Sequence, residues 1–188
     1  MTRDKALNYV RANVKNVNLI KHMLATEAIM RALAKRFGED EEEWGLTGLL
    51  HDIDIELIGD NFADHGRRAA DLAAEQGVSP QVCHAIMCHN WTNGIPCVTL
   101  LDSALLCTDP LTGLITAGAL IRPDKKLAGL TVESLMKRFG ERRFAAGAGR
   151  EQIAYCSAIG LDTEEFVGIG LEAMKEVRRC VRSESMKR

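Results

Sequence analysis

The sequence lacks the features that would place it in several large classes of protein. Its net charge is −2 over 188 residues, so it carries no strong nucleic-acid signal of the kind that a basic excess gives. The polar start, residues 1–5, is followed by no apolar stretch of leader length, and we expect no signal peptide and a cytoplasmic location. No segment sustains a period-two alternation of β-branched residues, which argues against a β-sheet.

Long uninterrupted apolar runs are also missing. The longest apolar region, 98–121, is broken by Asp102, Asp109 and Pro110. Two carboxylates and a proline do not suit the centre of a membrane span, so we expect no membrane segment.

The cysteines do not form a familiar pattern. The spacing of Cys83, His84, Cys88 and His89 fits no known zinc module, although a zinc site from these four is conceivable. Most cysteines lie among apolar neighbours, which is typical of reduced core residues in a cytosolic protein. The six are Cys83, Cys88, Cys97, Cys107, Cys156 and Cys180.

Helical signals run through the whole chain and predict one all-α domain over residues 1–188. Asn18 and Asp64 are expected to cap helices, Ser79-Pro80 is a start signal, and Asp162 with Glu165 forms a capping-box pattern. A basic end, 178–188, fits a solvated, frayed helix terminus. The expected helices span residues 18–37, 39–52, 64–77, 80–89, 96–108, 111–120, 131–139, 141–146, 150–159 and 162–182.

Histidine is distributed very unevenly. Histidine is the commonest metal ligand among side chains, and a neighbouring carboxylate is a hard partner for the same ion. His51 and Asp52 are adjacent, so on a regular helix they diverge by about 100° and share an ion only near a helix end. The sequence therefore predicts a metal site. All the histidines, His22, His51, His65, His84 and His89, precede residue 90, and the last third of the chain has none.

The two aspartates of the apolar region need a partner if they are buried, because an unpaired buried carboxylate costs several kcal/mol. Asp109 is either a metal ligand or a helix-capping residue before Pro110. Asp102 is exposed, hydrogen-bonded or a further metal ligand. His84 and His89 lie about 140° apart on a helix, so only one faces a common centre; we expect His89 there and His84 outside.

The ordered set His22, His51-Asp52, His65, His89 and Asp109 resembles the HD-domain superfamily of metal-dependent phosphohydrolases. The segments 49–54, 89–90 and 108–113 are similar to a bacterial HD-hydrolase subgroup. The resemblance implies a helical bundle of HD-domain type, with a metal-site core at about 18–115 and additional C-terminal helices at about 116–182. It implies six metal ligands: His22, His51, Asp52, His65, His89 and Asp109.

The resemblance also implies chemistry. His51 and Asp52 would be catalytic, and the cofactor would be one or two divalent ions (Fe, Mn, Zn, Co or Mg) that activate water. The expected partner is a small phosphorylated substrate, a nucleotide above all, held by cationic groups such as Lys21, Arg67 and Arg68. Oligomeric state stays open, with a homodimer as one option.

Two departures keep alternatives open. The doublet is followed by Asp54-Ile55 where many two-metal relatives have Gly-Lys, and the Gly-Tyr-Pro signature of cyclic-dinucleotide phosphodiesterases is missing. A di-iron oxygenase with the same six ligands is the second hypothesis, and a metal-binding signalling module without catalysis is the third. Asp54 and Glu56 are either groups that orient ligands and water or solvated loop residues.

Overall fold

The computed structural model describes residues 1–185, with side chains through Val177, and within that range every regular element is helical. This confirms the all-α prediction. The basic end predicted at 178–188 lies outside the described side chains. The α-helices are α1 (Arg3–Asn13), α2 (Val17–Phe37), α3 (Glu41–Leu50), α4 (Ile55–Ile58), α5 (Arg67–Glu75), α6 (Pro80–His89), α7 (Leu100–Leu120), α8 (Val132–Phe139), α9 (Arg150–Ala154) and α10 (Thr163–Ser185). Short 3-10 turns are η1 (Phe62–Asp64), η2 (Trp91–Asn93), η3 (Leu127–Gly129) and η4 (Tyr155–Ile159).

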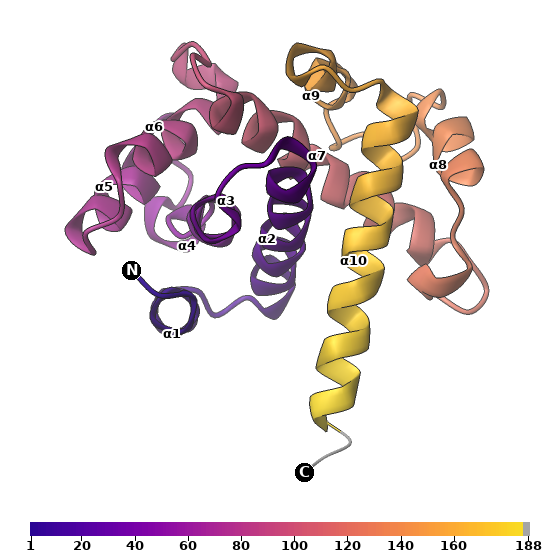
Figure 1. Ribbon diagram of the computed structural model, residues 1–188, viewed down its shortest axis with the longest axis horizontal. Coiled ribbons are helices and arrows are strands. Elements are labelled where there is room, and N and C mark those ends of the chain that lie inside the picture. The colour runs from indigo at the N-terminus through magenta and orange to yellow at the C-terminus, as the bar shows by residue number, and fades with distance from the viewer. Residues whose placement is uncertain (186–188) are drawn as a thin grey trace.

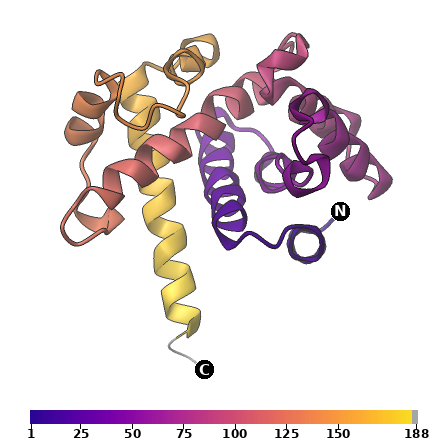
Figure 2. The ribbon, with the colours of Figure 1, turned by 180° about the vertical axis from the view of Figure 1, so that it is seen from behind.

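Helix α7 is the central helix of the structure. It packs against α2, α6, α8, α9 and α10, and Figure 2 shows it crossing diagonally between the N-terminal helices and the C-terminal ones. By length and composition α7 is apolar enough to span a membrane, but 67% of its most apolar window is buried inside the protein. Its apolar residues therefore serve as core.

Helix α2 is the second central element. One side of it packs on α3 and α7 and the other on α10 (Figure 1). Asn16 caps it, accepting the backbone N–H groups of Asn18 and Leu19, so the predicted cap at Asn18 is wrong by two residues. The Asn16 carboxamide satisfies N–H groups that the first helical turn leaves without partners.

An N-terminal helix was not predicted. Thr2 caps α1, and Arg3 forms two hydrogen bonds to Glu27, which is only 3% exposed on α2. Arg31 of α2 donates to the same carboxylate. Burial of Glu27 is possible because two guanidinium groups neutralise it.

Several predicted boundaries are corrected. Residues 100–120 form one continuous helix that contains Pro110, so the predicted break between 108 and 111 is wrong. Helix α5 starts after Gly66 rather than at Asp64, so His65 precedes it. The helix predicted over residues 141–146 is not formed, and residues 142–147 are turns instead. Asp162 does accept the N–H of Glu165 at the start of α10, as predicted.

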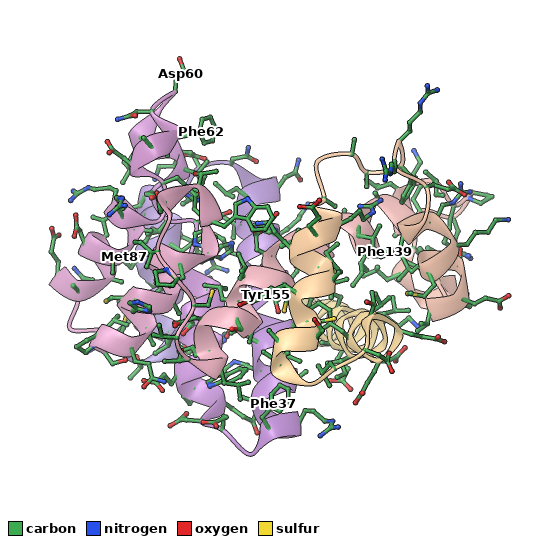
Figure 3. All side chains as sticks on the ribbon, turned by 90° about the horizontal axis from the view of Figure 1, so that it is seen from above. Phe37, Asp60, Phe62, Met87, Phe139 and Tyr155 are labelled. Carbon is green, nitrogen blue, oxygen red and sulfur yellow. The ribbon has the colours of Figure 1, made fainter. Side chains whose placement is uncertain are left out.

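The C-terminal helices cover the far side of α7. Phe166, Val167 and Leu171 of α10 are fully or almost fully buried. Figure 3 shows Met87 of α6 and Phe139 of α8 on opposite sides of the molecule, with the central helices between them. The site described next lies where α2, α3 and α6 meet α7.

Candidate metal centre

The end of α3 brings His51 and Asp52 together. The helix stops at Leu50, and residues 51–54 continue as turns, which is the departure from helical geometry that the adjacent pair requires. His51 is fully buried and Asp52 is 7% exposed. The side-chain atoms His51 Nε2 and Asp52 Oδ1 are 3.3 Å apart.

Four imidazoles converge on this point from four different segments. The Nε2 atoms of His22 and His51 are 3.1 Å apart, and those of His65 and His89 are also 3.1 Å apart. Asp109 Oδ1 lies 3.1 Å from His22 Nε2 and 3.7 Å from His51 Nε2. Two nitrogens bound to one ion at about 2.1 Å would be about 3 Å apart at a right angle, so these spacings fit shared cations.

Asp52 contacts all four imidazoles. Its Oδ2 atom is 3.3 Å from His22 Nε2. Its Oδ1 atom is 3.3 to 3.5 Å from the Nε2 atoms of His51, His65 and His89. One oxygen thus faces the His22 side and the other faces the His65–His89 side, which is the arrangement of a carboxylate that can bridge two ions.

Each imidazole is held from behind through Nδ1. His51 and His89 donate to the carbonyls of Gly48 and Ile86 at 2.8 and 2.5 Å. A carbonyl can only accept, so Nδ1 carries the proton and Nε2 presents its lone pair to the centre. This is the protonation state that metal binding requires.

The other two imidazoles have side-chain partners. His65 Nδ1 donates to Asp54 Oδ1 at 2.9 Å. His22 Nδ1 donates to Thr112 Oγ1 at 2.7 Å, and the Thr112 hydroxyl donates to the Asp109 carbonyl. Asp54 therefore orients a ligand, whereas Glu56 accepts from the backbone of Lys15 and Asn16.

Two glycines allow the close packing behind the imidazoles. A Cβ atom on Gly48 would lie 2.8 Å from the backbone nitrogen of Glu27, so only glycine lets α3 approach α2 this closely. Gly66 has a φ of +81°, and a Cβ there would lie 2.9 Å from the carbonyl oxygen of Ile86. That is the carbonyl that orients His89.

The electrostatics of the cluster favour a cation. Burial opposes ionisation of Asp52 and Asp109, but the surrounding imidazoles outweigh it and hold the pKa of each carboxyl below its ordinary value. Burial also opposes protonation of His22, yet its hydrogen bonds to Asp109 and Asp52 raise its pKa to about 10. A proton on His22 thus occupies a place that a metal ion would take.

Of the predicted ligands, the structure brings His22, His51, Asp52, His65, His89 and Asp109 into this one cluster. Asp109 lies inside α7 rather than at its end, so the alternative of a helix cap before Pro110 is wrong. His84 lies outside the cluster, next to Asp102.

The predicted phosphate-binding cations do not gather at the cluster. Arg67 donates to the carbonyl of Asn93, and Arg68 pairs with Glu75. Lys21 is exposed. None of the three lines the cavity described next.

A cavity of about 440 Å³ opens beside His22 and Asp109. One wall comes from α7 and the other from the turns at 145–148 and from Gln152. No Lys or Arg belongs to the lining that the described residues form. The lining residues are His22, Asp109, Pro110, Thr112, Gly113, Ala117, Ala145, Gly147, Ala148 and Gln152.

Arg150 shapes the second wall of the cavity. Its guanidinium donates to the carbonyls of Phe139, Phe144, Ala145 and Ala148 at 2.5 to 3.3 Å. Sequence reasoning missed this role, and it missed Gln152 and the 145–148 turns, because no local motif marks them.

Asparagines after α6 hold the His65 segment. Asn90 Nδ2 and Asn93 Nδ2 donate to the His65 carbonyl at 3.2 and 2.9 Å. The His89-Asn90 pair in the sequence is the available signal for the first of these contacts.

Within the described residues, an all-α framework brings together six nitrogen and oxygen donors that could hold metal ions. Residues 19–102 match the family model "HD domain". This segment, which is less than half of the chain, is therefore similar to that family. The match covers the first five donors and ends before Asp109.

The curated relatives that the chain matches are named Ribonuclease Y. The protein of Oleidesulfovibrio alaskensis is 30% identical over 96 residues, which are 51% of this chain and 18% of that protein. The Lawsonia intracellularis protein is 27% identical over 184 residues, or 96% of this chain and 30% of that protein. The Geotalea uraniireducens protein is 28% identical over 169 residues, or 90% and 28%.

This chain thus spans less than a third of the length of these three relatives. No solved structure gave a significant match.

Proposed function

We propose that this chain is a metal-dependent phosphohydrolase that cleaves phosphoester bonds in nucleotide-sized or short RNA substrates. The observation that carries the proposal is the contact of Asp52 with the Nε2 atoms of four imidazoles. A carboxylate among four inward-facing nitrogens serves no packing purpose and is suited to metal ions.

The donor set fits divalent transition metals, because mixed imidazole and carboxylate ligation suits Fe, Mn, Zn or Co better than a purely oxygen-ligated Mg site. His22, His51, Asp52 and Asp109 would hold one ion. His65 and His89, with Asp52 shared, would hold a second. When bound, such ions lower the pKa of a bound water and polarise a phosphoryl oxygen.

The protein itself orients the site and admits the substrate. Thr112, Asp54 and the carbonyls of Gly48 and Ile86 accept from the four Nδ1 atoms and so direct each Nε2 toward the cluster. The neighbouring cavity, at about 440 Å³, is within the size range of small-ligand sites. Gln152 on its wall offers one donor and one acceptor group to a base or sugar.

Two observations bear on the choice of substrate, and they favour different substrates. The name of the relatives supports a phosphodiester of RNA. The net charge of −2 gives little electrostatic attraction for a long polyanion. A short oligonucleotide, or the end of a nucleotide chain, is consistent with both observations. The named relatives do not favour the oxygenase alternative.

The test begins with metal quantification of untagged protein, followed by turnover assays with Mn²⁺. The substrates are a short 5′-labelled RNA, DNA of the same sequence, a 5′-mononucleotide and bis-p-nitrophenyl phosphate. We expect phosphoester cleavage that falls by more than about 100-fold in Asp52→Ala and stays unchanged in Asp64→Asn, an exposed carboxylate next to His65. Turnover that survives Asp52→Ala would place the chemistry elsewhere. Metal binding without cleavage of any substrate would favour the signalling module.

A further inference from the structure

A second cluster of ligand-type side chains lies outside the HD site. His84 and Cys88 lie one turn apart on α6, and Asp102 lies in the first turn of α7. One ligand atom from each comes within 4.8 Å of the others. The mechanism proposed above uses none of these three residues.

The distances within this cluster match those around a tetrahedral ion. His84 Nδ1 is 3.1 Å from Asp102 Oδ2 and 3.4 Å from Cys88 Sγ. Zinc–ligand bonds of about 2.0 Å to nitrogen or oxygen and 2.3 Å to sulfur give ligand–ligand edges of about 3.3 to 3.6 Å. Side chains from two helices already lie near those edges.

Asp102 supplies an independent reason to expect a ligand. It is fully buried, and its Oδ2 atom accepts the backbone N–H groups of Val98 and Thr99 as part of a capping box. Its Oδ1 atom is buried and has no hydrogen-bond partner among the described residues. The two backbone N–H groups and His84 together account for Oδ2. They leave Oδ1 of the same carboxylate without a partner in the described part of the chain, and a buried acceptor without a partner is rare and costly.

We propose that His84, Cys88 and Asp102 form a second metal site, separate from the HD cluster, that takes a thiophilic divalent cation such as Zn²⁺. Three protein ligands are enough for zinc when water completes the set, and Cys97 offers an alternative fourth ligand. The Cys97 thiol is a hydrogen-bond neighbour of Cys88 and Ser103.

Binding is balanced in charge and needs no redox step. The cation replaces the thiol proton of Cys88, which passes to solvent, and the thiolate and the Asp102 carboxylate offset the two positive charges.

The location suggests a structural task. The ion would join the end of α6 to the start of α7 across the segment 90–99. Cys88 immediately precedes His89, so the same ion would fix the turn of helix that presents a ligand to the HD cluster.

Cobalt substitution tests the proposal independently of catalysis. A Co²⁺–thiolate bond gives a near-ultraviolet charge-transfer band that imidazole and carboxylate ligands do not produce. The full chain would be titrated with Co²⁺ as wild type, Cys88→Ser, His84→Gln and the control Cys83→Ser. Cys83 lies on the same helix, and its thiol donates to the carbonyl of Val78.

We expect the band in wild type and in Cys83→Ser, its loss in Cys88→Ser, and at least tenfold weaker binding in His84→Gln. Bound zinc should fall by one ion per chain in Cys88→Ser. The half-exposed His84 provides a second variant should Cys88→Ser fail to fold, as judged by circular dichroism. A wild-type chain without the band at saturating Co²⁺, or a band of equal intensity in Cys88→Ser, overturns the second site while leaving the HD assays unaffected.

Discussion

Replacing Asp54 with Asn should weaken both the fold and the second ion of the HD cluster. Asp54 is fully buried. Its Oδ1 atom accepts from His65 Nδ1 at 2.9 Å, and its Oδ2 atom accepts from the backbone nitrogens of Gly66 and Ala69 at 2.8 and 3.1 Å. It is thus the side chain that both starts α5 and fixes the ring of His65.

The magnitude follows from what an amide can replace. Asparagine keeps one acceptor oxygen for the two backbone N–H groups, but its NH₂ group cannot accept from His65 Nδ1. A hydrogen bond to a charged acceptor contributes about 1.5–3 kcal/mol, and the two retained bonds lose their charge assistance. We therefore expect the free energy of unfolding to fall by about 3 kcal/mol.

The effect on metal binding should be selective. Loss of a partner behind a ligating imidazole costs about 10- to 100-fold in metal affinity. His65 faces the side of the cluster that it shares with His89. The affinity of the weaker of two metal-binding steps should therefore fall, whereas the affinity of the step on the His22 side should stay unchanged.

The assays are urea unfolding of the metal-free protein and a Mn²⁺ titration followed by calorimetry. Asp64→Asn is the matched control, because Asp64 is exposed, adjacent to His65 and bonded only to Asn61 among the described residues. We expect the control to stay within about 0.5 kcal/mol of wild type. Equal unfolding and equal metal affinity in Asp54→Asn and wild type would refute the assigned role.

Three further predictions follow from the same geometry. Gly48→Ala places a Cβ 2.8 Å from the Glu27 backbone. Calorimetric melting should therefore show a destabilisation of about 1–3 kcal/mol, and an unchanged melting temperature would contradict the close packing of α3 on α2. In Arg150→Lys, the lysine cannot make all the hydrogen bonds that Arg150 donates to the carbonyls of the cavity wall, so KM should rise about tenfold at unchanged metal content. A loss of bound metal instead would refute a role confined to the wall. The pKa of His22 is raised from 6.5 to about 10, so protonated His22 stabilises the metal-free protein fully below pH 6.5, and this stabilisation disappears as the pH rises through 10. Urea unfolding across this range should show a decline in the free energy of unfolding of wild type and no such decline in His22→Gln. A flat wild-type profile would contradict the prediction.

The sequence was informative where chemistry forces unusual residues into a pattern. His51-Asp52 and the remaining donors, taken in order, resembled the HD-domain superfamily, and that resemblance implied one converging cluster. Helix starts with strong local signals, such as Ser79-Pro80 and Asp162, were also predictable. Local sequence signals did not predict the extent of a helix where tertiary packing determines it. Helix α7 continues through Pro110, and its long buried contacts offset the loss of one backbone hydrogen bond.

Contacts between distant segments could not be predicted. Arg150 gives no sign in the sequence that it gathers the carbonyls of residues 139–148, and its neighbours carry no motif. No local signal pairs Asp102 with His84, and only the fold reveals that α6 and α7 place their side chains 3.1 Å apart. Side-chain pairs on different helices depend on crossing geometry, which the sequence pattern of either helix does not contain.

The division between the two halves of the chain has a consequence for specificity. Residues 19–102 match the family model and carry five of the six donors, whereas most of the cavity lining comes from residues 110–152. Thr112 joins the two, because its hydroxyl accepts from His22 Nδ1 while the residue itself lines the cavity. Changes in the 145–152 wall should therefore alter which phosphoester is admitted without disturbing the ions, and changes at Thr112 should alter both. On the proposed function, we expect substrate choice to depend on the half of the chain that the HD-domain match does not cover.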